Sequence, residues 1–430
     1  MGDGHDTFGN DLTRRDQRRL WHPYTQHGVD TDPLAVVAAK GAYLHLADGR
    51  TLLDGISSWW SILHGHGHPV LIEAMHEQAR KLDHVLFAGA THEPAVALAE
   101  ELVEVAPGDL SRVFYSDNGS TAVEVALKMV LHHHVHMGAP QKRVFIALEG
   151  SYHGDTFGAM SVGDPDPFFE PYLPLLFEAR RIPALPEAFD AAVRELGDEA
   201  AGVLVEPLVQ GAAGMRIHSA EFLQHVRRGC DEHELPLIAD EVMTGFGRTG
   251  AMFACERAGI APDLLCLAKG LTGGILPLAA TLTTERIFES FLHDERSRFF
   301  PHGHTWTANA IGCAVARASL RMAREEDVPA RLEAIGQRLY RSLESISNRP
   351  DVKGLRHIGG ICALDILPTG EDRAGYLSNL APTLRRRAIE EGALLRPLGN
   401  VLYAMPPACF EDHEVDRLAE TMLAILPHPS

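Results

Sequence analysis

Short apolar runs alternate with amphipathic segments through the middle of the chain. The runs have the length of buried strands, and they cover residues 113–115, 144–148, 203–205, 235–239 and 264–268. Residues 120–133, between the first two runs, repeat their apolar positions at the spacing of a helix. Strands that alternate with helices form a mostly parallel sheet covered on both faces. The pattern therefore predicts an α/β fold.

The two ends of the chain have a different pattern. Residues 42–46 and 51–54 flank Asp48 and Gly49, which is the signature of a hairpin. From about residue 327, a helical segment rich in Glu and Arg is followed by shorter strands and by loops that contain proline. We expect three parts, which are an N-terminal segment and hairpin that pack with the small domain (1–60), a large domain (61–326) and a small C-terminal domain (327–430).

Composition and charge argue against several classes of partner. The 430 residues are 45% hydrophobic and 23% charged, and their net charge of −19 disfavours nucleic acid and anionic membrane surfaces. No apolar run approaches the ~20 residues of a membrane helix, and the N-terminus lacks a secretory pattern. The six cysteines include no C-x-x-C pair. We therefore expect a cytoplasmic protein whose partners are small molecules.

An acid and an amine follow two of the predicted strands. Asp240 comes after the run at 235–239, and Lys269 comes after the run at 264–268. The carboxyl ends of parallel strands are where ligands bind in open α/β sheets. A lysine there forms a Schiff base if its pKa is lowered, and an aspartate keeps a pyridine nitrogen protonated. The pair indicates a pyridoxal phosphate site.

Two further features supply the other contacts of that cofactor. Gly119 and Ser120 lie at the start of the predicted helix, where small residues with free N–H groups bind phosphate. An ordinary helix cap is the alternative explanation. Tyr152 is a candidate ring to stack on the cofactor. Together with Asp240 and Lys269, these residues match each chemical group of pyridoxal phosphate.

A glycine motif, G-x-G-x-x-G at residues 245–250, lies between Asp240 and Lys269. In a dinucleotide fold such glycines directly follow a strand, and an acid comes about 20 residues later. Here Asp240 and Glu241 intervene, and the next acid is Glu256. We therefore expect no dinucleotide site.

Histidines and tryptophans gather at three places. The alternating histidines of residues 64–68 are interleaved with glycines and followed by Pro69, which favours a turn into a helix over a metal site. The histidines of residues 132–136 end a predicted helix and suit its negative end. Trp59 and Trp60 are adjacent, so in an extended segment they point to opposite sides and at least one lines a cavity.

The segment from Asp240 through the glycine motif, with Lys269 and the glycines after it, resembles the signature of the class III, fold-type I pyridoxal-phosphate aminotransferases. The likeness extends from Trp21 to Pro407 and so covers nearly the whole chain. It implies a large domain with a mostly parallel, seven-stranded sheet, a smaller α+β domain, and a homodimer with a shared active site.

The resemblance also implies roles on the cofactor side. Lys269 would bind the cofactor and move the proton, Asp240 would pair with the ring nitrogen, and Tyr152 would stack on the ring. The phosphate would be bound by Gly119, Ser120 and, from the partner subunit, Thr305.

On the substrate side, the motifs at 21–24, 57–60, 64–69 and 396–407 resemble those of a branch of the family that acts in biotin synthesis. This implies transamination of 8-amino-7-oxononanoate to 7,8-diaminononanoate, with S-adenosylmethionine as amino donor. Arg396 would bind the substrate carboxylate through paired hydrogen bonds. The other substrate-side residues would be Tyr24, Trp59, Trp60, Asp155, Arg248, Gly303 and Tyr403. The aromatic ones would surround the aliphatic chain.

Three positions depart from the usual pattern of the family. His304 stands where proline usually precedes the phosphate-binding threonine, and Met243 stands where glutamine or alanine is frequent. Ala212 replaces a glutamate that neutralises the substrate arginine in many ω-aminotransferases. Its absence agrees with the biotin branch.

Other functions stay open at the level of sequence. An ω-aminotransferase that uses lysine or another donor, or another ketone, fits the cofactor residues equally well. A metal-dependent hydrolase built on His64, His66 and Asp240 is compatible with residue types alone. A binding scaffold without a cofactor leaves Lys269 and Asp240 unexplained.

Overall fold

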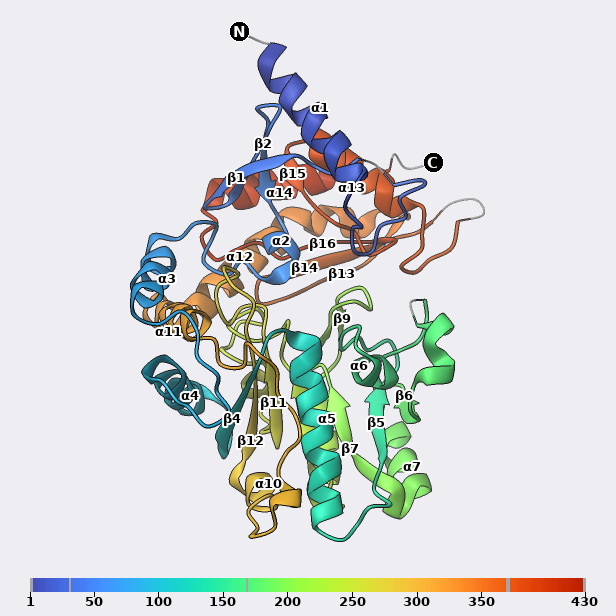
Figure 1. Ribbon diagram of the computed structural model, residues 1–430. Helices are drawn as coiled ribbons and strands as arrows, with labels where there is room; N and C mark the ends of the chain where they lie inside the picture. The colour runs from blue at the N-terminus through green and yellow to red at the C-terminus, as the bar shows by residue number, and fades with distance from the viewer. Residues whose placement is uncertain (1–2, 31, 168, 369–371, 428–430) are drawn as a thin grey trace. The chain divides into compact units, whose positions relative to one another are not determined.

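The computed structural model describes residues 3–30, 32–167, 169–368 and 372–427 (Figure 1). They form two compact units. Unit 1 is made of the described residues of Met1–His68, Ile335–His357 and Ile361–Ser430, and unit 2 of those of Pro69–Ala334 and Ile358–Gly360. The expected domain boundaries, near residues 60 and 326, stay a prediction. In the described part of the chain, no helix is long and apolar enough to cross a membrane.

Unit 2 contains a seven-stranded sheet of order β4-β12-β11-β10-β7-β5-β6. Its strands are β4 (Leu110–Ser116), β5 (Val144–Leu148), β6 (Ala179–Ile182), β7 (Ala200–Val205), β10 (Leu237–Asp240), β11 (Leu264–Leu267) and β12 (Ala279–Thr284). β12 runs antiparallel to both neighbours, and the other pairs are parallel. All residues of the central strands β5, β7, β10 and β11 are buried, which is why they appear as continuous apolar runs. The predicted α/β fold is confirmed.

The helices of unit 2 are α3 (Pro69–Lys81), α4 (Glu93–Val105), α5 (Gly119–His136), α6 (Phe157–Val162), α7 (Pro186–Leu196), α8 (Ala220–Glu232), α9 (Ala254–Ala258), α10 (Glu285–Glu289) and α11 (Ala310–Glu325). A two-stranded sheet pairs β8 (Val209–Gln210) with β9 (Arg216–Ile217), and α12 (Val328–Leu343) contains the boundary between the units. Short 3-10 helices are η1 (Glu170–Leu175), η2 (Gly197–Glu199), η3 (Arg296–Arg298) and η4 (Glu344–Asn348).

Helix α5 lies on one face of the sheet, roughly along the strands, and packs against β11 and β12 (Figure 1). Asn118 caps its first turn, because the Asn118 side chain accepts from the Thr121 N–H while the Thr121 hydroxyl accepts from the Asn118 N–H. Two of the histidines at its other end, His133 and His134, do not supply the charge that would suit the negative end of the helix. Burial lowers the pKa of His133 to about 4 and also lowers the pKa of His134. Both rings are therefore neutral near pH 7 and contribute packing instead of charge.

Unit 1 combines the N-terminal and C-terminal parts of the chain. Its elements are α1 (Asp3–Gln17), β1 (Val36–Lys40), β2 (Tyr43–Leu46), β3 (Thr51–Asp54), α2 (Ser57–Trp60), β13 (Val352–Ile358), β14 (Ile361–Ile366), α13 (Leu380–Glu390), β15 (Ala393–Leu394), β16 (Val401–Ala404) and α14 (Asp412–Ala424). β2 and β3 form the predicted hairpin, and β15 extends their sheet by pairing in parallel with β3. β13, β14 and β16 form a second sheet.

The segment with the two tryptophans is not extended. Ser57, Ser58, Trp59 and Trp60 have φ values of 50, 44, 76 and 75, so α2 is a left-handed turn. It still separates the rings, because Trp60 is buried and Trp59 is half-exposed. Left-handed backbone is rare for residues other than glycine and is common at functional sites.

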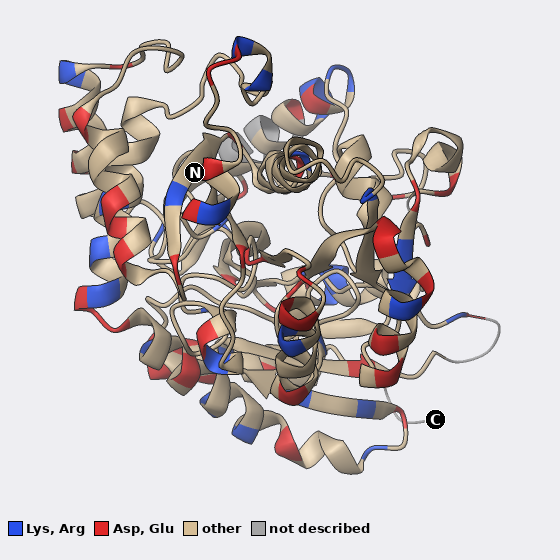
Figure 2. Cartoon of the chain, turned by 90° about the horizontal axis from the view of Figure 1, so that it is seen from below, with Lys and Arg blue, Asp and Glu red and all other residues tan. Residues whose placement is uncertain are grey.

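Acidic and basic residues lie interspersed on the helices (Figure 2). Several form pairs between elements, such as Arg317 of α11 with Glu101 of α4, at 2.7 Å. At this exposure such pairs contribute about 0–1 kcal/mol each. The excess of acid in the composition is therefore spread over many elements.

Candidate active site

Asp240 and Lys269 lie at the same edge of the unit 2 sheet. Asp240 is the last residue of β10, and Lys269 follows β11, the parallel neighbour of β10. Parallel neighbours end at one edge, which is the usual ligand edge of such a sheet. The structure thus brings together the two residues on which the cofactor prediction depends.

Asp240 is held in a fixed orientation. One of its carboxylate oxygens lies 2.7 Å from Nδ1 of His153, and the other accepts the N–H of Val242 at 3.1 Å. Asp240 is 5% exposed and His153 is 3% exposed. A buried carboxylate placed in this way suits a partner that carries a proton on a ring nitrogen.

The Lys269 amine is prepared to act as a nucleophile. Burial lowers its pKa below the ordinary value, while the negative charges of Asp240 and Glu206 oppose that shift. A lower pKa increases the fraction of neutral amine, which is the form that attacks a carbonyl carbon.

Glu206 is a buried acid that connects these residues to Tyr152. Burial raises its pKa to about 7. Its two oxygens accept the N–H groups of Tyr152, at 3.1 Å, and of Gly211, at 3.0 Å. The backbone of Tyr152 is therefore fixed, and its hydroxyl donates to Asp155 at 3.1 Å. The Tyr152 ring stacks on Phe169, with centroids 6.3 Å apart.

The first turn of α5 provides an anion site. The capping box satisfies the N–H of Thr121, whereas the N–H groups of Gly119 and Ser120 have no hydrogen-bond partner among the described residues. The Ser120 hydroxyl accepts the N–H of Asp155 at 2.9 Å, so its own proton remains available for a ligand. Free N–H groups at the positive end of a long helix bind phosphate.

Two glycines keep this anion site open. A Cβ on Gly119 would lie 2.6 Å from Val242, and a Cβ on Gly154 would lie 1.7 Å from the Ser120 hydroxyl. The site therefore combines an amine, a buried carboxylate and a phosphate cradle in one unit. These residues fit pyridoxal phosphate.

Unit 1 carries a second cluster, which we call the arginine cluster: Tyr24, Trp59, Tyr376 and Arg396. The Arg396 guanidinium lies 4.4 Å from the centroid of the Trp59 ring and 6.0 Å from that of Tyr24. The Tyr376 hydroxyl accepts from Arg396 at 3.2 Å. In the described part of the chain, the contacts of the Arg396 guanidinium are to aromatic side chains. The cluster is thus a rigid cation with aromatic walls.

Trp60 and Tyr403 form the buried side of the same region. The Trp60 Nε1–H donates to the Tyr403 hydroxyl at 2.9 Å, and their ring centroids are 6.2 Å apart. Burial raises the pKa of Tyr403, so the hydroxyl keeps its proton. These two rings support the turn that carries Trp59.

The remaining predicted residues lie elsewhere in unit 2. Arg248 is buried, and its carbonyl accepts the N–H of Gly360 at 3.0 Å. Gly303 and Thr305 are exposed on one loop. His304, between them, lies 3.1 Å from the Asp117 carboxylate. The site assignments themselves stay predictions.

Sequence patterns did not reveal His153, Glu206, Asp54 or Tyr376. His153 adjoins Tyr152 in sequence, which was a usable signal once Tyr152 had been singled out. Asp54 ends a predicted strand, as Asp240 does. Glu206 directly follows the predicted strand at 203–205, which was the same signal that singled out Asp240, whereas Tyr376 had no local signal.

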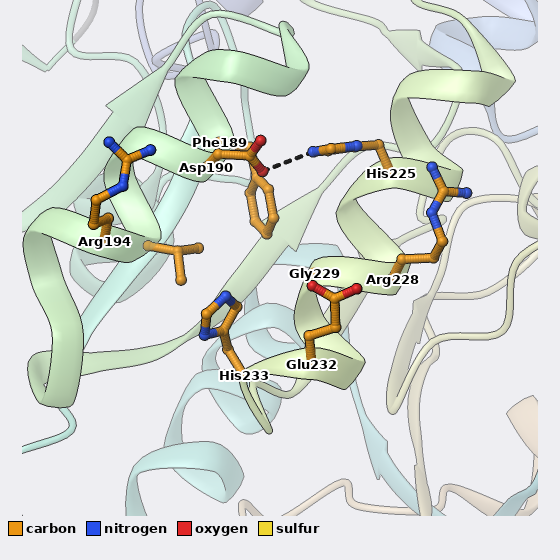
Figure 3. Close-up of a pocket in the computed structure, with 9 residues that line it drawn as sticks. Phe189, Asp190, Arg194, His225, Arg228, Gly229, Glu232 and His233 are labelled. Carbon is orange, nitrogen blue, oxygen red and sulfur yellow. Dashed lines mark hydrogen bonds and ion pairs between the residues drawn. The ribbon is translucent and has the colours of Figure 1, made fainter.

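A surface pocket lies between α7 and α8 (Figure 3). These helices carry none of the predicted site residues. It is lined by Phe189, Asp190, Val193, Arg194, His225, Arg228, Gly229, Glu232 and His233. His225 bonds to Asp190 across it at 2.7 Å. None of its lining residues belongs to the predicted site, so we assign it no role in catalysis.

The metal-hydrolase alternative finds no support in side-chain geometry. Within the described residues, no group of three His, Cys, Asp or Glu side chains is arranged to hold a metal ion. His66 lies instead 2.8 Å from the Asp54 carboxylate. It is therefore engaged in a local pair.

Comparison with known proteins identifies one group. Residues 24–426 match the family described as aminotransferase class-III. The chain is 48% identical over 422 residues to the adenosylmethionine-8-amino-7-oxononanoate aminotransferase of Synechococcus elongatus, covering 95% of this chain and 98% of that protein. The crystal structure of the enzyme of the same name from Methanocaldococcus jannaschii has a TM-score of 0.92 at 34% identity, covering 97% and 98%. A pyridoxal-phosphate-bound amine transaminase from an uncultivated Pseudomonas species gives 0.88 at 30%, covering 95% and 98%.

Proposed function

This chain belongs to the class-III aminotransferase family, and we propose that it aminates 8-amino-7-oxononanoate to 7,8-diaminononanoate in biotin synthesis, with S-adenosylmethionine as amino donor. Likeness over nearly the full length to proteins named for this reaction supports the substrate. The arginine cluster is the structural observation that carries the proposal, because the ketone ends in a carboxylate.

The enzyme depends on pyridoxal phosphate, as its family and the PLP-bound neighbour indicate. When bound, this cofactor withdraws electrons from the carbon that loses or gains the amino group. Lys269 would hold the cofactor and carry the proton to and from that carbon. Asp240, oriented by His153, would keep the ring nitrogen protonated, and Gly119 and Ser120 would bind the phosphate.

Arg396 suits the carboxylate of the ketone. Its planar fork offers two parallel N–H donors, which match two carboxylate oxygens. The stack on Trp59 fixes the plane of the guanidinium before substrate binds, which reduces the entropy lost on binding. Aromatic rings beside it suit an aliphatic chain.

We propose that the enzyme works as a homodimer in the cytoplasm. The loop that carries Thr305 is exposed, and Trp306 next to it is 55% exposed and contacts His84. Leu86, in the same neighbouring segment as His84, is 63% exposed. Exposed apolar side chains on adjoining segments are typical of a contact surface. A partner subunit there would also bring Thr305 to a phosphate.

Separate half-reactions test the function. The enzyme loaded with cofactor is mixed with S-adenosylmethionine or lysine, and the loss of cofactor absorbance identifies the donor. 8-Amino-7-oxononanoate is then added, and mass spectrometry identifies the product. We expect S-adenosylmethionine to react and 7,8-diaminononanoate to form, whereas Lys269→Ala does neither. If lysine alone reacts, the proposed donor is wrong, and if no diamine forms, the proposed substrate is wrong.

A further inference from the structure

The left-handed turn Ser57–Trp60 requires outside support. Left-handed backbone costs roughly 1–2 kcal/mol per residue for an L-amino acid, and here four consecutive residues adopt it without a glycine. A turn with this conformation relaxes unless its surroundings hold it.

Asp54 supplies most of that support. Its side chain is fully buried, and one carboxylate oxygen accepts the backbone N–H of Ser58 at 2.9 Å and that of Ile56 at 3.3 Å. The other oxygen accepts the Ser58 hydroxyl at 2.6 Å and lies 2.8 Å from Nε2 of His66. One carboxylate thus connects Ser58 of the turn to a histidine eight residues later.

His66 is itself fixed by its backbone. Its N–H donates to the carbonyl of Gly41 at 2.8 Å, and its carbonyl accepts the N–H of Gly41 at 2.9 Å. Because Gly41 connects β1 and β2, the histidine joins the turn to the sheet that contains these strands. Asp54 is therefore held from two sides, by the turn and, through His66, by the β1–β2 connection.

We propose that Asp54 and His66 are positioning residues for recognition of the substrate carboxylate. They hold the turn that places the Trp59 ring against the Arg396 guanidinium. Without the Asp54 carboxylate the turn relaxes, the Trp59 ring leaves Arg396, and the guanidinium loses its fixed plane. This inference rests on the proposed function, because it takes the carboxylate of the ketone as the ligand of Arg396.

The test compares the ketone with its carboxamide, which keeps the chain but lacks the negative charge. We expect Asp54→Asn to lower kcat/KM for the acid about 10- to 150-fold, mainly through KM, because a charged hydrogen-bonded contact contributes about 1.5–3 kcal/mol. For the carboxamide, kcat/KM should change by less than about threefold. His66→Ala should behave in the same way, and His66→Gln should recover activity because its amide N–H can replace Nε2–H.

Asp48→Asn is the matched control. Asp48 lies in the β2–β3 turn of the same sheet but is exposed and bonds to Arg50, so kcat/KM should be unchanged for both substrates. Equal losses on acid and carboxamide would show a merely structural role and overturn the proposal. If Asp54→Asn fails to fold, the two His66 variants decide the same question. If the wild-type enzyme prefers another carboxylated ketone, the proposed substrate is wrong, and the same acid-to-amide comparison is made on that ketone.

Discussion

The phosphate cradle, which is formed by Gly119 and Ser120, gives the most specific prediction. Gly154 packs so closely against Ser120 that there is room for a hydrogen atom but not for a Cβ. Gly154 has φ +118, and a Cβ there would lie 1.7 Å from the Ser120 hydroxyl oxygen, 2.7 Å from Ser120 Cβ and 2.9 Å from Ser120 Cα. Rotation of the serine side chain relieves only the first of these contacts. The substitution Gly154→Ala must therefore move the start of α5 or the loop that faces it.

Gly138→Ala is the matched control for this change. Gly138 also has positive φ, +78, but a Cβ there meets nothing within 4 Å. Both substitutions carry a backbone penalty of roughly 1–2 kcal/mol. Gly154→Ala adds about 1–3 kcal/mol of overpacking. It also displaces the bond from the Asp155 N–H to the Ser120 hydroxyl.

The expected consequence concerns the phosphate. Loss of one hydrogen bond to a charged group costs about 1.5–3 kcal/mol, which corresponds to roughly 10- to 150-fold in Kd. Apoenzyme is titrated with pyridoxal phosphate and with pyridoxal, which lacks the phosphate, and urea unfolding measures stability. Gly154→Ala should raise the Kd of pyridoxal phosphate by this factor and leave the Kd of pyridoxal nearly unchanged. Gly138→Ala should change only the free energy of unfolding. Equal weakening of both ligands, or none, would refute the assignment of this cradle to phosphate.

Three further predictions concern other parts of the chain. Arg396→Lys should raise KM for the acid ketone about 10-fold with a smaller change in kcat, because lysine cannot form the paired bonds; steady-state kinetics measures both. Mixing Lys269→Ala with Thr305→Val subunits should restore activity, because one site of the mixed dimer then contains both intact residues. Turnover is measured after the two variants are refolded together. If turnover is not restored, the active site is not shared between subunits. Burial lowers the pKa of His133 to about 4 in the folded state, so between pH 6.5 and about 4 only the unfolded state binds a proton at this residue. The free energy of unfolding should therefore fall by at most about 3 kcal/mol as the pH drops through this window. In His133→Leu, the free energy of unfolding should depend less on pH in this window than in the wild-type protein. In the control His413→Leu, which changes an exposed histidine, the pH dependence should match that of the wild type.

In unit 2, the strands that the sequence predicted are those with continuous apolar runs. β12 was missed because its sequence is mainly alanine and threonine, although it is buried in the sheet. There the Thr281 hydroxyl donates to the carbonyl of Ala122 at 2.8 Å, which removes the cost of burying it. β6 was missed because it contains two arginines. Arg181 is satisfied by the carbonyls of Gly163 and Ser161, each at 2.7 Å. In both cases long-range hydrogen bonds overrode the local pattern.

The sequence indicated the candidate site where the chemistry of the cofactor requires a particular residue type, an amine or a carboxylate, at the end of a strand. Lys269 and Asp240 stand at the ends of apolar runs, and the small residues at the start of the helix pointed to phosphate only in combination with that pair. The left-handed turn at Ser57–Trp60 was not predictable, because serine and tryptophan do not favour positive φ. Its conformation depends on Asp54, His66 and the carbonyl of Met405, which accepts from Ser57 at 2.8 Å and lies far away in sequence. Such a turn depends on local and long-range contacts together, and its own residue types do not indicate it.

Asp240 and Asp54 use the same local arrangement for different ends, and one pair of variants separates them. In each, one oxygen accepts the N–H two residues later and the other lies within 2.8 Å of a histidine nitrogen. Asp240 would act through its charge on the cofactor nitrogen, so Asp240→Asn should lower kcat for acid and carboxamide ketones alike, by about 100- to 1,000-fold, and shift the absorbance of the bound cofactor. Asp54 would act through the shape of a turn, so Asp54→Asn should leave that absorbance unchanged and affect only the acid. If Asp54→Asn shifts the cofactor absorbance, its role is not confined to the arginine cluster.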